Sequence, residues 1–379
     1  MRTRTSRRAF LAASGMTALA GCLGSLRTRG GGSAAGDGNG GGGDAGASGS
    51  SASGAGGASG APPLADRTLP VAYEFDELQS RVVSGGPPKD GIPSIDDPSF
   101  VAADEVSSNL QPNSVVFGVE RNGVVRAYPQ YILVNHEIVN DVHGDQPVSV
   151  TYCPLTGTAM GFLRGGTTFG VSGKLVNNNL VMYDRETDSR WPQILGTAIS
   201  GTHRGKSLRE FRVIWTTWSR WKRAHPDTEV LSEDTGYARS YGRDPYGSYT
   251  PPGGYYTGSR LLFEPLRVND AYHLKKVVIG TRLNGGAAAF VKSSLRENRL
   301  LTGDLDGTVL IAAYDQALDT AYVYRNPDGA TVKPVSGSNT FDGPAGTARA
   351  HELSLPRAYA FDGMWFALSG FYPDIVPFG

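Results

Sequence analysis

A short pattern typical of a β-hairpin occurs twice in this 379-residue chain and limits the folds open to it. Residues 115–129 and 277–291 align without a gap and are identical at six of fifteen positions. Each copy places an Asn-Gly pair, Asn122-Gly123 in the first, between two apolar runs, which strongly favours a two-residue hairpin turn. The recurrence predicts two similar lobes related by internal duplication, although a turn flanked by valines also recurs by chance in β proteins.

The second copy departs from the first where a cysteine stands. Aligning 309–314 with 148–153 places Tyr314-Asp315-Gln316-Ala317 opposite Cys153-Pro154-Leu155-Thr156. Chemistry that depends on the cysteine would then belong to the first lobe, with the second as its partner or lid. Residues 132–139 and 215–226 predict short helices, the second amphipathic. We therefore expect a β-rich α+β fold with two similar lobes and a few short helices.

The first 22 residues predict an exported lipoprotein. Arg7-Arg8 precedes an apolar run of about thirteen residues, which closes on Leu19-Ala20-Gly21-Cys22. This is the pattern of a twin-arginine signal that ends in a lipoprotein cleavage box. The run is shorter than the roughly 20 residues that span a bilayer. We expect acyl chains on Cys22 to anchor the protein to the outer face of the cytoplasmic membrane, at the cell surface.

Composition divides the rest of the chain. From Gly30 to Ala61, every residue except Asp37, Asn39 and Asp44 is Gly, Ala or Ser, which cannot build a core. We expect a flexible tether over 23–62, a first lobe over 63–240 that carries Cys153, and a second lobe over 241–379 without a cysteine. The chain has 36 basic and 36 acidic residues and no basic run, which argues against nucleic acid as a partner. Nothing in the sequence indicates a particular cofactor or oligomeric state.

Cys153 is the free thiol that remains once Cys22 is lipidated, because the chain has two cysteines. It follows a strand-like run and precedes Pro154, which restricts the local backbone. Hydroxyl groups of Thr156 or Thr158 could donate to a thiolate and lower its pKa, and thiolate is the reactive form. The alternative is a buried structural cysteine that acts as a small apolar residue.

Several motifs resemble those of the exported proteins grouped as domain of unknown function 3179, over about residues 65–379. They include Tyr128-Pro129, His136-Glu137-Ile138-Val139-Asn140-Asp141, Tyr152-Cys153-Pro154-Leu155-Thr156-Gly157, Trp191-Pro192-Gln193 and Asp244-Pro245-Tyr246. Some members are described as selenoproteins with cysteine or selenocysteine at the fifth position of Tyr-Cys-Pro-Leu-X-Gly. The resemblance implies thiol or selenol redox chemistry. Thr156 stands at that position here, which excludes a disulfide within the motif.

The sequence leaves three functions open. The chain could be a one-thiol oxidoreductase with Cys153 as nucleophile, Thr156 as hydroxyl donor, His136 as base and an external thiol as redox partner. It could hold a soft metal, above all copper, on Cys153 with His136 or His143. It could instead be a non-catalytic surface module whose Tyr, Trp and Gly residues line a groove for a polymer or a partner protein. The candidate substrate or rim residues are Tyr152, Thr158, Asp184 and Arg185.

Overall fold

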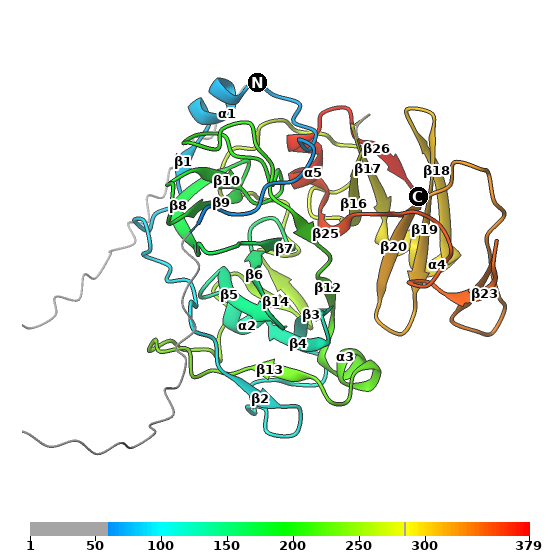
Figure 1. The fold of residues 1–379 in the computed structure, drawn as a ribbon, viewed down its shortest axis with the longest axis horizontal. Helices are drawn as coiled ribbons and strands as arrows, with labels where there is room; N and C mark the ends of the chain where they lie inside the picture. The colour runs from blue at the N-terminus through cyan, green and yellow to red at the C-terminus, as the bar shows by residue number, and fades with distance from the viewer. Residues whose placement is uncertain (1–59, 284–285) are drawn as a thin grey trace, which may run out of the picture. The chain divides into compact units, whose positions relative to one another are not determined.

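The structure, a computed structural model, describes residues 60–283 and 286–379 (Figure 1). The twin-arginine signal, Cys22 and the tether up to residue 59 lie outside the described residues. The described part of the chain belongs to one compact unit, Ala55–Gly379. Within that part, none of the helices has the length and apolar character needed to cross a membrane.

The first half of the unit contains two sheets that pack against each other. Their strand orders are β12-β3-β4-β13-β2 and β11-β7-β6-β5, and their apolar side chains form one shared cluster. The hairpin β3–β4 turns through Asn122 and Gly123, which both have positive φ, as the predicted turn requires. The strands are β2 (Phe100–Ala102), β3 (Val115–Arg121), β4 (Val124–Pro129), β5 (Ile138–His143), β6 (Gln146–Cys153), β7 (Thr158–Leu163), β11 (Glu210–Phe211), β12 (Ile214–Thr217) and β13 (Glu229–Leu231).

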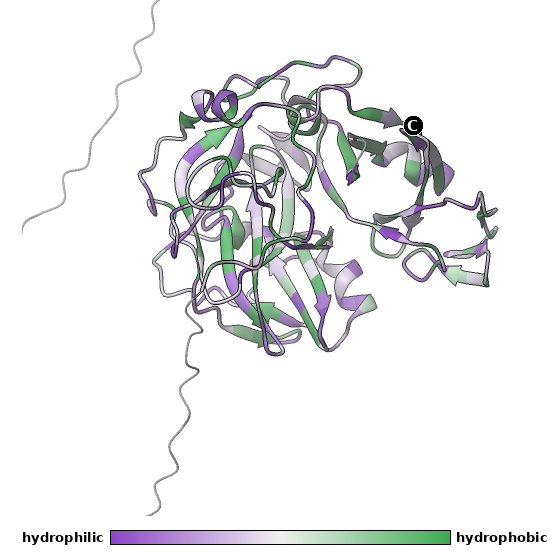
Figure 2. Cartoon of the chain, turned by 45° about the horizontal axis from the view of Figure 1, so that its top comes forward, coloured by the Kyte–Doolittle hydropathy of each residue, from purple (hydrophilic) through white to green (hydrophobic). Residues whose placement is uncertain are grey.

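The second half contains two sheets of the same kind, with strand orders β25-β16-β17-β26 and β18-β19-β20-β24. Figure 2 shows hydrophobic residues along strands of both halves. The strands are β16 (Val277–Leu283), β17 (Gly286–Val291), β18 (Leu300–Leu305), β19 (Thr308–Asp315), β20 (Thr320–Arg325), β24 (Arg357–Ala358), β25 (Ala360–Met364) and β26 (Val376–Phe378). The five helices of the described residues are α1 (Phe75–Ser80), α2 (Gln130–Leu133), α3 (Trp218–Ala224), α4 (Lys292–Asn298) and α5 (Trp365–Phe371).

The two halves repeat one order of elements, which confirms a β-rich fold with two similar lobes. The first residues of β3 to β7 are separated by the same numbers of residues as the first residues of their counterparts, β16 to β20. The same holds for the first residues of β11, α3 and β13 when they are compared with those of β24, α5 and β26. We call residues 115–231 repeat 1 and residues 277–378 repeat 2. An insertion separates the two parts of each repeat, over 164–209 in repeat 1 and 326–356 in repeat 2. The boundary at residue 240 between the lobes stays a prediction.

Each insertion carries one small sheet. The first contains β8 (Phe169–Val176), β9 (Asn179–Asp184) and β10 (Arg190–Pro192), and it pairs with β1 (Val83–Ser84). The second contains β21 (Lys333–Pro334), β22 (Thr340–Gly343) and β23 (Gly346–Arg349). Between the repeats, β14 (Gly247–Tyr249) and β15 (Pro252–Gly254) form a hairpin.

The strand register corrects the sequence alignment by one residue at the cysteine. Cys153 pairs with Thr158 across β6 and β7, and Asp315 pairs with Thr320 across β19 and β20. Asp315, and not Tyr314, is therefore the counterpart of Cys153. Because side chains alternate between the two faces of a strand, a slip of one residue would put Tyr314 on the wrong face.

The two predicted helices are shorter than the sequence pattern indicated. Of residues 132–139, only the start is helical, because Ile138 already pairs with Thr151 as the first residue of β5. Residues 215–217 belong to β12, which pairs with β3, and α3 begins at Trp218. In both places the pairing of main-chain groups in a sheet overrides the local apolar spacing.

Before its last strand, each repeat has a helix that packs against the other repeat. Trp218 and Trp221 of α3 share an apolar cluster with residues of β19, β20 and the second insertion. Trp365 and Leu368 of α5 share the equivalent cluster with residues of β7 and the first insertion. Gly118 of β3 leaves the space that the Trp221 ring occupies. The two contacts are reciprocal, as in an isologous dimer interface, and they fix the repeats against each other.

Candidate functional site

Cys153 lies at the end of β6 with its sulfur on the outer face of the sheet. Side chains alternate along the strand, so Tyr152 joins the core of repeat 1 while Cys153 joins the cluster that contains α5. Only 1% of Cys153 is exposed. Its thiol donates to the Asn178 carbonyl at 3.5 Å, and the Leu180 N–H donates to the sulfur at 3.4 Å. The β8–β9 hairpin therefore covers the sulfur.

The surroundings of Cys153 hold it as a protonated thiol. Burial raises the pKa of the Cys153 thiol to about 11, and the nearby Glu137 acts in the same direction. Hydrogen bonds from Thr156 and Leu180 lower the pKa of the thiol, but by less than burial raises it. Since thiol reactivity follows the thiolate fraction, the geometry favours a structural thiol over a nucleophile.

We expect Cys153 to resist alkylation in the native protein. In a Cys22→Ala chain, where Cys153 is the remaining thiol, iodoacetamide at pH 8 should label it at least a hundredfold more slowly than free glutathione, because the sulfur is both buried and protonated. Unfolding in guanidinium chloride should restore full labelling. Mass spectrometry of timed samples measures both rates, and native labelling at the glutathione rate would contradict the assignment.

Thr156 and Thr158 belong to a buried hydrogen-bond network. Their hydroxyl groups are 2.8 Å apart, and Thr158 donates to the side-chain oxygen of Gln193 at 2.6 Å. The Asn179 amide donates to Thr156 at 3.1 Å, and the Gln193 amide donates to Thr151 at 2.8 Å. These bonds join the β6–β7 hairpin to the first insertion and satisfy polar groups that would otherwise be costly to bury.

The two candidate histidines are engaged elsewhere. His136 contacts the Pro93 carbonyl at 2.8 Å and the Tyr241 hydroxyl at 2.7 Å. His143 contacts the Tyr128 hydroxyl at 2.8 Å and Asp141 at 3.2 Å. None of these partners is a partner of the Cys153 sulfur. Among the described residues, no three His, Cys, Asp or Glu side chains are grouped so that they could hold a metal ion.

The candidate rim residues divide into two groups. Asp184 is buried and accepts from the Trp191 ring N–H at 3.0 Å, and Arg185 pairs with Asp90 at 3.1 Å, as expected of structural contacts. Tyr152 is also buried, but its hydroxyl lies 3.2 Å from that of Tyr249. Tyr249 lines a pocket between the repeats, so Tyr152 contacts a residue of the pocket lining without lining the pocket itself.

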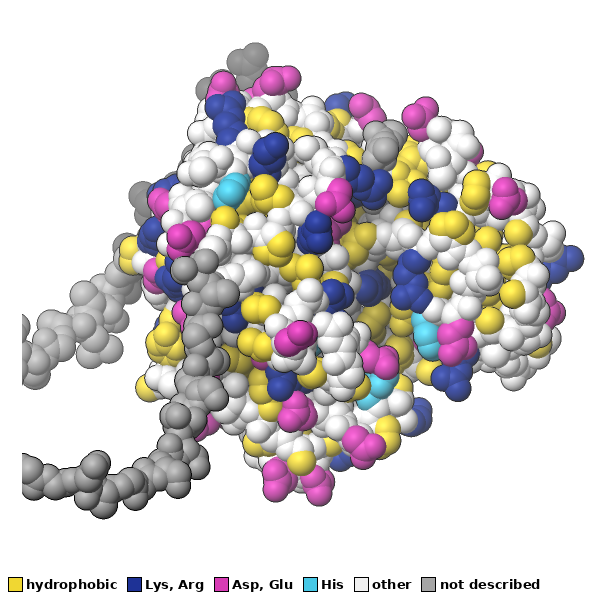
Figure 3. Space-filling view, viewed as in Figure 1, with side chains coloured by type: hydrophobic (Ala, Val, Ile, Leu, Met, Phe, Trp, Pro, Cys, Tyr) yellow, Lys and Arg dark blue, Asp and Glu magenta, His cyan; other side chains and the backbone are white. Residues whose placement is uncertain are grey.

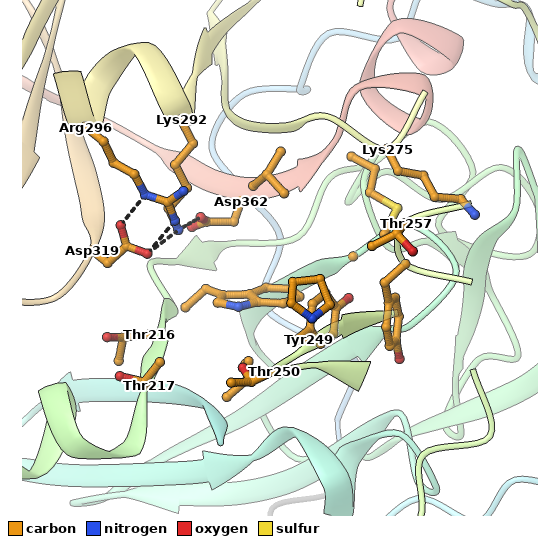
Figure 4. A pocket seen from close by; sticks show the side chains of 17 residues that line it. Thr216, Thr217, Tyr249, Thr250, Thr257, Lys275, Lys292, Arg296, Asp319 and Asp362 are labelled. Carbon is orange, nitrogen blue, oxygen red and sulfur yellow. Dashed lines mark hydrogen bonds and ion pairs between the residues drawn. The ribbon is translucent and has the colours of Figure 1, made fainter. Parts of the chain in front are cut away.

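The pocket has a volume of about 350 Å³ and is lined from both repeats and from the segment between them (Figure 4). Residues at equivalent positions of the two repeats line it in pairs. They are Val115 with Val277, Gly157 with Asp319, Trp215 with Asp362, and Thr217 with Met364. The pocket therefore lies on the approximate two-fold axis that relates the repeats.

Repeat 2 supplies an ionic wall. Arg296 donates two hydrogen bonds to Asp319, at 2.8 and 2.7 Å, and the Lys292 ammonium lies 2.8 Å from Asp362 and 3.9 Å from Asp319 (Figure 4). Arg212 of repeat 1 also contacts Asp362, at 3.2 Å. Arg212 does not line the pocket. The charged residues that do, among those the structure describes, are Lys275, Lys292, Arg296, Asp319 and Asp362, so the lining holds one more cation than carboxylates, which favours an anion. Lys292 is only 5% exposed, so its charge acts with little screening by water.

Repeat 1 and the β14–β15 hairpin supply an aromatic wall. The rings of Tyr249 and Tyr256 stack at 3.9 Å, and Trp215 meets Tyr249 edge-on at 5.1 Å. Thr216 also lines the pocket; it is 3% exposed and its hydroxyl has no hydrogen-bond partner among the described residues. An unpaired buried hydroxyl costs about 1–3 kcal/mol, which a ligand acceptor would relieve.

The ionic wall could not be predicted from a local motif, because its members are isolated charges far apart in the chain. A signal was nevertheless present in the internal alignment. Continuing the alignment of β3 with β16 places Lys292 opposite Gln130 and Asp319 opposite Gly157, so repeat 2 is charged where repeat 1 is neutral. The aromatic wall was foreseen only as a general excess of Tyr and Trp, without Trp215 or Tyr249 being singled out.

Residues 89–375 match the family described as "Protein of unknown function (DUF3179)". The chain belongs to this family. The DUF3179 match spans repeat 1, all of repeat 2 except β26, the pocket and Cys153, so almost all of the duplicated fold lies within the family's own region. No curated protein and no solved structure matches the chain. The DUF3179 description names no activity.

Proposed function

We propose that this DUF3179 protein is an exported binding protein that holds a small organic anion in the pocket between its repeats. The observation that carries the proposal is the excess of one cation over carboxylates in the pocket lining, together with the rings of Trp215 and Tyr249 beside them. A carboxylate would pair with Lys292 and Arg296, because hydrogen bonds between charged partners are among the strongest in proteins. The flat body of the ligand would pack against Trp215 and Tyr249. An apolar lining with a few convergent polar groups is the usual composition of a ligand site.

The binding function agrees with the surface module that the sequence left open. Thiol redox chemistry has less support, because Cys153 is buried, protonated and outside the pocket lining. A copper site has less support because the hydrogen bonds of His136 and His143 hold both rings to other groups. On the face drawn in Figure 3, basic and acidic side chains are interspersed, which does not favour a polyanion such as nucleic acid.

We propose that acyl chains on Cys22 attach the protein to the outer face of the membrane. The Cys22→Ala chain should leave the membrane fraction for the soluble fraction, since one anchoring residue would be lost and the described residues contain no spanning helix. Immunoblots of separated fractions, with incorporation of labelled palmitate, measure the change. A Cys22→Ala chain that stays in the membrane fraction would contradict the proposed lipid anchor.

Binding is tested by titrating the full chain with small carboxylates such as benzoate and galacturonate, each paired with its neutral amide or sugar. We expect a carboxylate to bind at least tenfold more tightly than its neutral counterpart, and the difference to shrink in high salt. Arg296→Gln should weaken binding about tenfold, and because Arg296 is exposed the variant should fold. Lys292→Gln tests the buried cation, and Lys333→Gln on an exposed strand is the control. Equal affinity for charged and neutral ligands would overturn the proposal.

A further inference from the structure

A second cavity adjoins the pocket between the repeats. It has a volume of about 450 Å³ and lies among the loop before β3, the start of α2 and the segment 241–250. Val115, Tyr249 and Thr250 line both cavities, so the two spaces meet at these side chains. Each has the size of an ordinary ligand site. Together they offer an elongated site with two compartments.

The two compartments differ in chemistry. The first has the ionic wall, whereas most residues of the second are neutral and include the amides and hydroxyls of Asn113, Ser114 and Ser248. The charged residues of the second compartment are Arg243 and Asp244. Amides and hydroxyls both donate and accept hydrogen bonds, so they suit a ligand that does the same. Asp244, the carboxylate of the second compartment, already accepts from Gln130 at 2.9 Å and Tyr256 at 2.7 Å. Its charge is therefore engaged within the protein.

Gln130 lines the second compartment. It is 7% exposed, and its side-chain nitrogen is committed to Asp244 and to the hydroxyls of Tyr152 and Tyr256. Gln130 is the counterpart of Lys292 in repeat 2, so equivalent positions supply a neutral acceptor to one compartment and a cation to the other.

We infer that the ligand of this elongated site is an acidic oligosaccharide. This inference rests on the proposed function and names the class of its anion. A sugar acid in the first compartment would place its carboxylate at Lys292 and Arg296 and an apolar face against Trp215. A neighbouring sugar would place its hydroxyls against Gln130 and Asn113. An extended acidic peptide is less suited, because the facing main-chain groups of β14 and β15 pair with each other and the remaining contacts come from side chains.

The test is a calorimetric titration of the full chain with four probes: galacturonate, its linear trimer, neutral maltotriose and triglutamate. We expect the galacturonate trimer to bind at least tenfold more tightly than the monomer, and both neutral maltotriose and triglutamate to bind more weakly than the trimer. Asn113→Ala should lower the affinity for the trimer about fivefold and leave the monomer unchanged. Asn113 is exposed, so the variant should fold, and the exposed Asn298→Ala is the matched control.

Failure of this inference is distinguishable from failure of the proposed function. If monomer and trimer bind equally and Asn113→Ala changes neither, the oligosaccharide is excluded while anion binding stands. If triglutamate binds more tightly than the trimer, the ligand is an acidic peptide and the inference is overturned. If no carboxylate binds and Arg296→Gln has no effect, both the proposed function and this inference are wrong.

Discussion

Replacing Arg282 by methionine should lower the free energy of unfolding by about 3–5 kcal/mol, the usual cost of removing one partner of a buried ion pair. Arg282 of β16 is 2% exposed and donates to the Glu210 carboxylate of β11 and to the Ile194 carbonyl. Burial raises the pKa of Glu210 to about 7 even though Arg282 lowers it. Without the guanidinium, Glu210 has to lose its charge or remain buried without its hydrogen-bonded cation. Urea unfolding at pH 8 measures the loss.

Two controls separate this ion pair from a general effect of losing an arginine. Arg209→Met removes the exposed pair with Asp66 and should cost less than about 1 kcal/mol. Adding Glu210→Met to Arg282→Met should restore much of the stability, because no unpaired charge is then buried. The loss should also shrink at pH 5, where Glu210 is protonated. A loss for Arg282→Met no greater than that for Arg209→Met would show that this pair does not join the repeats.

Replacing Glu137 by glutamine should stabilise the protein at pH 9 by several kcal/mol and change it little at pH 4. Glu137 is 7% exposed, and burial raises the pKa of its carboxyl to about 8 from an ordinary value of 4.5. Between these values the folded state holds a proton that the unfolded state has lost, so stability falls as the pH rises. Each unit of pKa difference corresponds to about 1.4 kcal/mol, and glutamine has no such dependence.

The Glu137 effect is read from the difference between variant and parent in unfolding curves at pH 4, 6, 8 and 9. Taking the difference removes the contributions of other groups, such as Glu210, that titrate in both proteins. Glu297→Gln, at an exposed position of α4, is the control and should give a difference that hardly varies with pH. A constant difference for Glu137→Gln as well would mean that this carboxyl is ionised in the folded protein at neutral pH.

The duplication could be predicted from the sequence only over the first part of each repeat, before the insertion. The hairpin around Asn122-Gly123 was predictable because turn residues act locally. The second part of the repeat also carries a match, with Trp218, Pro226 and Asp227 opposite Trp365, Pro373 and Asp374. It was missed because the first insertion is longer than the second, so the alignment that fits the first part of the repeat does not fit the second part.

The site was less accessible to sequence reasoning than the fold. Cys153 was singled out for its motif, yet its reactivity depends on burial, which the strand's alternation sets and the β8–β9 hairpin completes. The pocket depends on the approach of two repeats, and neither Lys292 nor Trp215 belongs to a local motif that names a ligand. Residues that are far apart in the chain and meet only through tertiary packing form no short-range sequence pattern.

The most direct test of the pocket is a crystal structure of the full chain with the tightest carboxylate from the titrations. We predict electron density for the ligand between the repeats, with its carboxylate within hydrogen-bond distance of Lys292 or Arg296 and its ring against Trp215 or Tyr249. We also predict that an acceptor on the ligand pairs with the hydroxyl of Thr216. Density for that ligand at another surface, with the space between the repeats closed or filled by side chains, would contradict the account.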